Sequence, residues 1–474
     1  MSKMHRLLLS FSIFLLIASC MDLAEKSHYD SKSHDESSMK DEGPQGSSEK
    51  IGEGSVSLPS DIALVVEKLK APLQECPEKL WPGMQLDDSQ ILFTLDKEAF
   101  LWPLHGQKLQ KIDYDSLAAQ FRTGLYSFGE YKEKKTMSIA LDLWPSSHAA
   151  SFVLHEGFHY FVQPFWPTDS LVNSSREQSY PLQASPRYYR YMMSLELAGY
   201  LRQDHSDLGR IRFWYDRYQE EFTEEALSIR RTDVMEGTAK FVDSIGVQDS
   251  FCSRSLEEIT QQALLSIEPT IMPSDVDSES YTIGALAGLT LSMVGKDGWK
   301  NKVSEESKTP LEVLMENVVA APQQEDPAQR ALVEEQVELE NEYISRTLLP
   351  AVESLESDET ILIFAPSSMV LGSYSVGGFT RYPEKELSFR LNLEATFQAS
   401  SGSGTYQLDG VTVAESGNNP CQDWGYLFAV PKDTFQNGVP SEDGILNLNT
   451  QRWKANFVSF RHESDDLGRT WLCL

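Results

Sequence analysis

The residues whose types and spacing are best suited to chemistry are His155, Glu156 and His159, in the sequence His-Glu-Gly-Phe-His. In a helix, histidines at positions i and i+4 lie one turn apart on one face, so both imidazoles can bind one Zn²⁺. Glu156, between them in sequence, can then act as general base on a metal-bound water. The pattern predicts a hydrolytic zinc centre. The alternative is a helix that contains these residues without a metal.

A mostly buried helix must position these three side chains. Pro145 and the serines after it offer a start and a cap, and Pro164 ends the helix. Between them Gly157 is the only helix-weakening residue, and the remaining positions are largely apolar. Polar groups buried on such a helix need partners, and a metal ion provides one.

A catalytic zinc site built on two histidines needs a third protein ligand, with one position left for water. Glu236, in Met-Glu-Gly-Thr-Ala, is the preferred candidate on a separate helix. Glu196, in Ser-Leu-Glu-Leu-Ala-Gly-Tyr, lies nearer in sequence and is the competitor. Alternatively, Glu236 is a carboxylate at the start of a helix. Farther along, Tyr281 begins the sequence Tyr-Thr-Ile-Gly and is expected to open an apolar helix that runs to about Met293.

Taken in this order, the three motifs resemble those of the gluzincin metallopeptidases, notably their aminopeptidase-like group. The resemblance implies that Glu236 is the third zinc ligand, that Glu156 is the general base and that the Tyr281 hydroxyl donates to the oxyanion. It also implies a zincin-type catalytic domain that cleaves a peptide or protein substrate. Packing at a helix start is the alternative role for Tyr281.

The chain departs from that family in two respects. Glu236 follows His159 by 77 positions (236 − 159), whereas the family has roughly eighteen residues there. An inserted helical layer between residues 188 and 222 would explain the difference. No Gly-x-Met-Glu-Asn sequence precedes the His-Glu-Gly-Phe-His motif, and Met315-Glu316-Asn317 follows it. Aminopeptidase specificity is therefore not implied. The resemblance spans at most residues 136–303.

The elements around these motifs can be predicted from periodicity and turn residues. Residues 136–143 read as a strand, which is either the edge strand that pairs with substrate in zincins or an ordinary core strand. A strand pair is expected near residues 91–101. Helices are expected over residues 60–70, 114–124, 188–203, 208–222, from 224 onward, 299–317 and 327–355, the last kinked or broken at Pro350. Within residues 299–317, Thr309-Pro310 is a helix-start signal.

After Asp358 the sequence changes to short apolar runs separated by Gly, Ser, Asn and Pro. Strands are expected over residues 360–365, 369–374, 387–399, 405–413, 425–430 and 453–461. The predicted fold class is therefore α+β: a mainly helical catalytic domain over residues 58–357, followed by a small all-β, sandwich-like domain over residues 358–474. Two roles for the β domain are equally open from sequence: binding of cell wall, glycan or protein, and stabilisation of the neighbouring domain.

The first 57 residues are not expected to belong to the folded body. Basic residues precede an apolar run over residues 7–18, which ends in Ile-Ala-Ser-Cys. This resembles a bacterial lipoprotein signal (residues 1–20) with lipid on Cys20, and Met21 after the cysteine favours the outer membrane. A plain secretory signal is the alternative. Residues 21–57 are rich in Ser, Asp, Glu, Lys and Gly, which predicts a disordered tether.

Charge and cysteine content agree with export. The net charge of −30 argues against a nucleic-acid partner. Apart from Cys20 there are four cysteines, which allow three pairings. Placement within the two domains favours Cys76 with Cys252 and Cys421 with Cys473, but sequence alone does not decide.

The prediction from sequence is a lipid-anchored zinc metallopeptidase of the bacterial cell envelope, held to the membrane through Cys20. The alternative from another functional class is a surface binding lipoprotein whose metal site is structural or vestigial.

Overall fold

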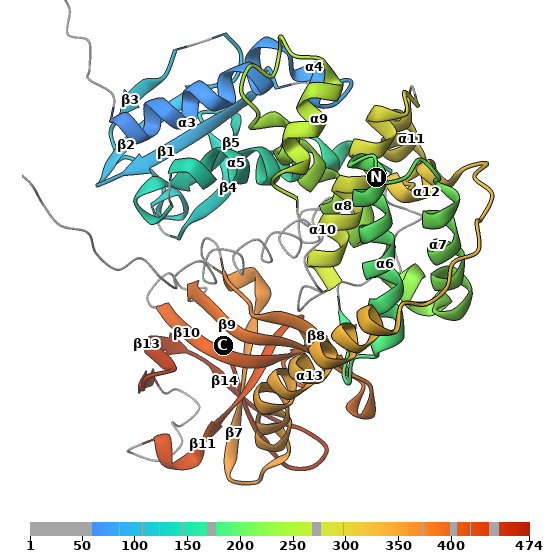
Figure 1. Cartoon of the computed structure of the whole chain (residues 1–474). Helices are drawn as coiled ribbons and strands as arrows, with labels where there is room; N and C mark the ends of the chain where they lie inside the picture. The colour runs from blue at the N-terminus through green and yellow to red at the C-terminus, as the bar shows by residue number, and fades with distance from the viewer. Residues whose placement is uncertain are drawn as a thin grey trace, which may run out of the picture.

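The computed structural model describes residues 59–84, 86–106, 108–122, 124–144, 146–167, 177–267, 276–296, 298–370, 374–398, 405–417, 419–435 and 445–474. The predicted signal segment, the tether and Cys20 lie outside these residues. Within them the chain forms a small five-stranded sheet with helices, a helical bundle and a β-rich C-terminal part (Figure 1). This mixture of helix and sheet confirms the α+β class. No helix among the described residues has the length and apolar character needed to cross a bilayer.

The five-stranded sheet has the order β3-β2-β1-β5-β4. Its strands are β1 (Ser89–Leu95), β2 (Glu98–Pro103), β3 (Gln110–Ile112), β4 (Tyr126–Tyr131) and β5 (Lys134–Ala140). Strands β1 and β2 form the predicted antiparallel pair, and β5 runs parallel to β1. Strand β5, which precedes the histidine motif, therefore lies inside the sheet between β1 and β4. The edge-strand interpretation of residues 136–143 is wrong, since β4 occupies that edge.

Two helices flank this sheet. Helix α3 (Ser60–Lys70) has the predicted bounds and buries Ile62, Val65 and Leu69. After it come a π-helical turn (Ala71–Glu75) and α4 (Pro77–Leu80). Helix α5 (Ser146–Phe161) contains the histidine motif and contacts both α3 and β5.

The helix predicted over residues 114–124 is wrong; the described residues of this segment contain only a 3₁₀ turn, Ala119–Phe121. Asp113 accepts a hydrogen bond from the backbone N–H of Asp115, and the Ser116 hydroxyl donates to the Asp113 carbonyl. Such local bonds compete with helix formation. Leu117 and Phe121, whose four-residue spacing imitates a helix, instead pack on the outer face of the sheet.

The helical bundle matches most predicted segments. Its helices are α6 (Ala184–Leu201), α7 (Gly209–Glu221), α8 (Thr223–Gly246), α9 (Leu256–Leu264), α10 (Val276–Met293), α11 (Trp299–Glu306) and α12 (Pro310–Met315). The predicted start of α12 at Thr309-Pro310 is confirmed by a capping box between Thr309 and Glu312. Helix α10 begins at Val276, so Tyr281 lies in its second turn rather than at its start. Likewise Glu236 lies in the interior of α8, which excludes the helix-start interpretation.

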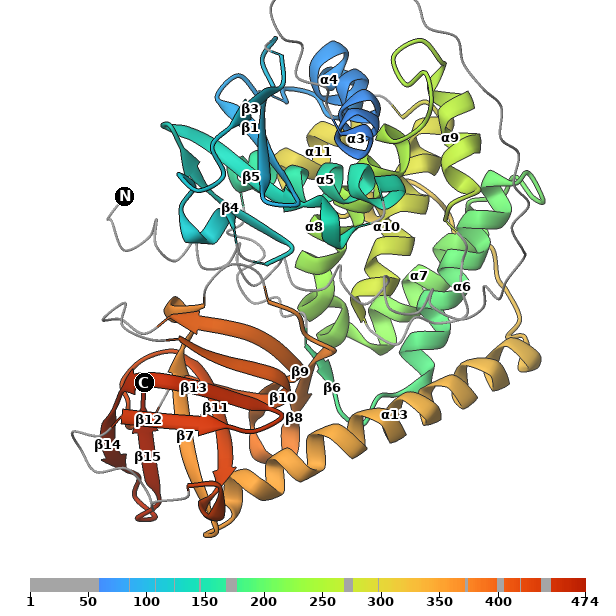
Figure 2. The same ribbon diagram turned by 90° about the vertical axis from the view of Figure 1, so that its left-hand side faces the viewer.

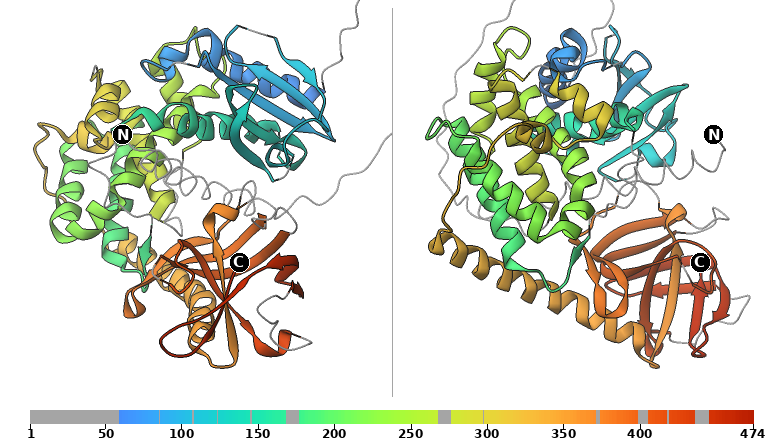
Figure 3. Two further views of the ribbon diagram at one scale, coloured as in Figure 1. Left: turned by 180° about the vertical axis from the view of Figure 1, so that it is seen from behind. Right: turned by 90° about the vertical axis from the view of Figure 1, so that its right-hand side faces the viewer.

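Helix α13 (Pro327–Glu356) connects the bundle to the C-terminal part and contacts α6 as well as β7, β9, β10 and β11 (Figure 2). It is one continuous helix through Pro350. Of the two predicted outcomes at this proline, the break is therefore wrong and the kink stays a prediction. Figure 3 shows the same parts from two further sides.

The C-terminal strands are β7 (Thr360–Pro366), β8 (Gly378–Tyr382), β9 (Leu387–Gln398), β10 (Thr405–Ser416), β11 (Gly425–Pro431), β12 (Ile445–Asn449), β13 (Trp453–Ser459), β14 (Arg461–Ser464) and β15 (Thr470–Cys473). Together with β6 (Gln178–Ser179) they form one hydrogen-bonded network, not the two separate sheets of a sandwich. The strand predicted over residues 369–374 is not found in its described residues, because Ser367–Met369 is a 3₁₀ turn and Val370 makes only an isolated bridge. Strand β7 is buried on both faces: Ile361 and Ile363 face the β core, and Leu362 and Phe364 join the larger core.

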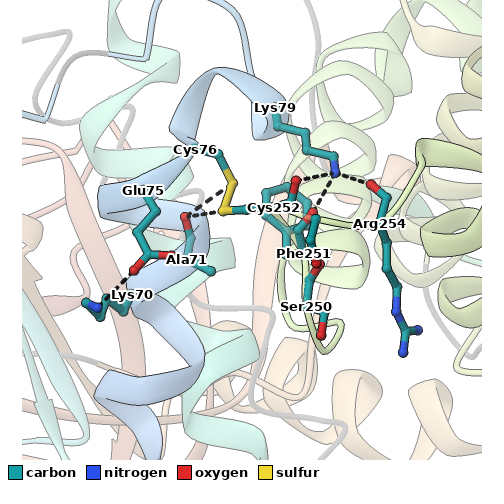
Figure 4. Close-up of a disulfide and its surroundings, with 10 residues drawn as sticks. Lys70, Ala71, Glu75, Cys76, Lys79, Ser250, Phe251, Cys252 and Arg254 are labelled. Atoms are coloured by element: carbon teal, nitrogen blue, oxygen red, sulfur yellow. Dashed lines mark hydrogen bonds and ion pairs between the residues drawn. A yellow bond between two sulfur atoms is a disulfide. The ribbon is translucent and has the colours of Figure 1, made fainter.

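Two disulfides confirm the favoured pairing, Cys76 with Cys252 and Cys421 with Cys473. The first joins the segment between α3 and α4 to the loop after α8 (Figure 4). Lys79, one turn after Cys76, donates to the carbonyls of Phe251 and Arg254 in the same loop.

Candidate metal centre

Helices α5 and α8 bring His155, His159 and Glu236 together in the protein interior. The Nε2 atoms of the two histidines are 3.1 Å apart. Oε2 of Glu236 lies 3.2 Å from Nε2 of His155 and 3.1 Å from Nε2 of His159. The exposed fractions of the three residues are 4%, 3% and 0%. This buried group could hold a metal ion.

The Nδ1 atom of His159 contacts the side chain of Gln163. The Gln163 amide nitrogen donates to the Met235 carbonyl at 2.7 Å and to the Thr238 hydroxyl at 2.9 Å. A carbonyl can only accept, so the amide orientation is fixed and its oxygen faces Nδ1 of His159 at 2.6 Å. An amide oxygen can bond to Nδ1 only as an acceptor, so this contact favours the tautomer with its proton on Nδ1 and its lone pair on Nε2.

Asp243 does the same for His155, because its Oδ2 accepts from Nδ1 at 3.1 Å. Burial alone would raise the pKa of the Asp243 carboxyl. The charge of Lys240, whose Nζ is 3.2 Å from Oδ1, and the hydrogen bond from His155 outweigh burial and hold that pKa below its usual value. Asp243 is therefore an anion that keeps the His155 lone pair on Nε2.

The chemistry of this donor set fits a cation. Two imidazole lone pairs and a carboxylate oxygen point at one another within 3.2 Å. If both rings are neutral with the proton on Nδ1, no proton lies between the two Nε2 atoms and the carboxylate oxygen. The lone pairs on these three atoms then repel one another, and a positive ion at the centre removes this repulsion.

The glycines of the two motifs after α5 explain how Glu236 and Tyr281 come to lie near each other. Gly237 and Gly284 face each other across α8 and α10. A Cβ on Gly284 would lie 2.2 Å from Cα of Gly237, and a Cβ on Gly237 would lie 2.8 Å from Cα of Gly284. Only glycine allows this approach of the backbones. It places the Tyr281 ring 5.5 Å from the His155 ring, in an edge-to-face arrangement.

Glu156 and Tyr281 are both buried, with exposed fractions of 0% and 6%. Glu156 is one residue from His155 and three from His159, so its Cα lies on the flank of the face that presents the ligands. The structure therefore brings His155, His159 and Glu236 together with the Tyr281 ring beside His155, and Glu156 lies on the same helix as the two histidines.

Glu196, the competing ligand, lies elsewhere. Its carboxylate on α6 accepts two hydrogen bonds from Arg210, at 2.6 and 2.9 Å, and forms an ion pair with His205 at 3.0 Å. The structure therefore places Glu236, and not Glu196, beside the two histidines.

Gln163 and Asp243 were not identified as functional residues from sequence. A signal was present in each case: Gln163 is four positions after His159, and Asp243 is seven positions after Glu236, two turns along the same face of α8. These spacings identify Gln163 and Asp243 as partners of the ligand histidines only once α5 and α8 are known to pack together.

A pocket of about 540 Å³ lies away from this centre. It is lined by the start of α6, the corner between α7 and α8, and β8, and its charged residues include Arg187, Glu225 and Arg381. None of His155, His159 and Glu236 lines it, so the pocket is not part of the metal centre.

Comparison of the chain with protein-family models, with curated proteins and with solved structures found no match.

Proposed function

We propose that this protein is a zinc-dependent peptidase, exported and anchored to the membrane of the bacterial envelope by lipid on Cys20. The observation that supports zinc most directly is the spacing of the three donor atoms. Zinc bonds of about 2.0–2.1 Å in tetrahedral geometry separate the ligand atoms by roughly 3.3 Å. The three separations here are 3.1, 3.2 and 3.1 Å.

The number of ligands favours a catalytic site over a structural one. Structural zinc sites are enclosed by four protein ligands, whereas catalytic sites use three and leave one position for water or substrate. Among the described residues the converging group consists of two histidines and one glutamate, which is the number of protein ligands in a catalytic site.

A zinc ion held there would polarise a peptide carbonyl and lower the pKa of water. In this proposal Glu156 takes a proton from the attacking water and passes it to the leaving amine. The Tyr281 hydroxyl donates a hydrogen bond to the oxyanion as it develops. Asp243 keeps the lone pair of His155 directed at the ion. This division of roles resembles that of the gluzincins.

Two substitutions separate the base from the ligand. Glu156→Gln keeps the shape of the side chain and removes the base, so zinc should stay bound while peptide cleavage falls by roughly 10²- to 10⁴-fold. Glu236→Gln removes an anionic ligand, so zinc affinity itself should fall. Glu196→Gln is the matched control and should leave zinc binding unchanged.

Zinc content and cleavage of a broad peptide library would be measured for the parent and all three variants. Loss of zinc in Glu196→Gln with retention in Glu236→Gln would refute the ligand assignment. A parent that binds zinc with four protein ligands would instead favour a binding lipoprotein with a structural metal site.

A further inference from the structure

Gln163 lies two residues after the end of helix α5. Its side chain is polar and takes no part in the chemistry proposed above. It is fully buried, and it opens the 3₁₀ turn Gln163–Phe165 directly after α5. A primary amide in this position has four hydrogen-bonding positions to satisfy, so its retention in the core calls for specific partners.

In the part of the chain that the structure describes, the hydrogen-bond partners of the Gln163 side chain all belong to the metal centre or to the residues next to its ligands. Its oxygen accepts from His159 on α5, and its nitrogen donates to Met235 and Thr238 on α8. Met235 immediately precedes Glu236, and Thr238 follows Glu236 by two positions. One amide therefore joins a ligand on the first helix to the backbone that presents the ligand on the second.

The Thr238 hydroxyl is itself oriented, because it donates to the Val234 carbonyl at 2.7 Å. Its lone pair is thus available to the Gln163 nitrogen. With both N–H groups of the amide committed to α8, the amide cannot turn over and present a donor to His159.

We propose that Gln163 is a positioning residue that holds His159 in the Nδ1–H tautomer and sets the distance between His159 and Glu236 before the metal binds. The inference rests on the proposed function in taking these residues as zinc ligands. A neutral imidazole can place its proton on either nitrogen, and only the Nδ1–H form leaves Nε2 free to bind.

The test uses the full exported chain without its signal and two measurements. The first is the tautomer of His159 in the metal-free protein, read from nitrogen chemical shifts of ¹⁵N-histidine-labelled protein. The second is zinc affinity, measured by competition with a chromogenic chelator. Neither requires peptidase activity.

Gln163→Met keeps the length of the side chain and removes both hydrogen-bonding groups. We expect the Nε2–H tautomer of His159 to appear and zinc to bind roughly 10- to 100-fold more weakly, the range for loss of a hydrogen-bond partner of a ligand. Gln163→Glu retains an acceptor, so it should restore the Nδ1–H tautomer and bind zinc more tightly than Gln163→Met. Thr238→Val removes one acceptor for the amide but leaves Met235, and should keep the parent tautomer.

An Nε2–H tautomer in the metal-free parent would overturn the inference without any variant. So would a Gln163→Met protein that keeps both the parent tautomer and the parent zinc affinity. If the parent binds no zinc, the proposed function fails, while the tautomer measurement still decides the role of Gln163.

Discussion

His155 and His159 each have one ring nitrogen bonded to an oxygen that must accept, from Asp243 in one case and Gln163 in the other. The two oxygens differ in charge. Asp243 is an anion whose pKa is depressed by Lys240, and a depressed carboxyl pKa contributes stability that is present above pH 4 and lost as the pH falls through the folded-state value. Gln163 does not titrate. The hydrogen bond from His155 to Asp243 therefore depends on pH through the carboxylate, whereas the hydrogen bond from His159 to Gln163 has an acceptor that does not titrate.

Lys300 is a second single residue whose ionisation is expected to make the stability of the protein depend on pH. Its Nζ donates to the carbonyls of Lys79 and Leu80 and lies 5.2–5.8 Å from the ring centroids of Trp81, Phe241 and Trp299. Burial lowers the pKa of this lysine to about 7. The rings favour the cation and oppose this effect, but they also leave the partly buried ammonium group with less water around it than a full charge needs.

The prediction is that Lys300 makes stability depend on pH above 7. Between pH 7 and about 10 the unfolded chain binds a proton that the folded chain does not, so stability rises with pH by at most about 1.4 kcal/mol per unit. Below pH 7 the contribution is constant. Relative to Lys300→Met, the parent should therefore gain stability from pH 7 to 9 in urea unfolding. A difference that is constant over this interval would mean that the lysine stays charged.

At the scale of elements, the crossing of α8 and α10 decides where Glu236 and Tyr281 lie. Gly237 and Gly284 are the contact point, and one turn farther along a Cβ on Gly288 would lie 2.6 Å from the Phe241 ring. At the first point the obstructing atoms are backbone, which cannot rotate away. At the second they belong to a large ring that is itself fully buried.

Gly284→Ala should therefore lower the free energy of unfolding by about 1–3 kcal/mol or more and weaken zinc binding, because α10 must move away from α8. The matched control is Gly157→Ala within the histidine motif. A Cβ there would lie 3.5 Å from the Phe161 ring, an ordinary contact, and alanine should stabilise α5 by about 0.5–1 kcal/mol. The measurement is the free energy of unfolding of each variant relative to the parent, obtained by chemical denaturation. Equal effects of the two substitutions would contradict the account of the crossing.

At the scale of the whole molecule, covalent links and one long helix join parts that are distant in sequence. The Cys76–Cys252 disulfide closes a separation of 176 residues, and Cys421–Cys473 closes 52. Helix α13 contacts the bundle and the C-terminal strands. The larger core accordingly includes residues from both, such as Leu197 of α6 in the bundle and Leu362 and Phe389 of β7 and β9.

Loop-closure entropy predicts that the longer link contributes more, about 5 kcal/mol against about 4 kcal/mol for the shorter one, within a measured range of about 2–5. Replacing Cys76 and Cys252 by serine should lower the thermal transition by more than replacing Cys421 and Cys473. Calorimetry of the two double variants makes the comparison. A larger decrease for the Cys421 and Cys473 variant would contradict the explanation by loop-closure entropy.

The proposed membrane anchor belongs to the same scale. Cys20→Ala removes the acceptor for lipid, so the protein should move from the membrane fraction to the soluble fraction, because stable anchoring depends on the acyl chains. Fractionation after a salt wash measures this. Retention of the variant in the washed membranes would refute lipidation at Cys20.

The sequence by itself determined the local features of the site. The four-residue spacing of His155 and His159, the apolar positions around them and the following Pro164 are enough to predict a buried helix that presents two ligands on one face. The bounds of α3 and the start of α12 followed in the same way, since periodicity and capping act within a few residues. The helix predicted over residues 114–124 was wrong, because hydrogen bonds between side chains and the nearby backbone replace the helical ones there.

The tertiary structure alone decided which distant residues meet. Sequence left Glu236 and Glu196 both open as partners of the histidines, because either lies on a helix and the number of residues between does not fix how helices pack. The close crossing at Gly237 and Gly284 and the amide of Gln163 bring α8 and α10 to α5, while Arg210 holds Glu196 elsewhere. Likewise β5 is interior because β4 pairs along its free side, a choice set by contacts between strands and not by the residues of β5.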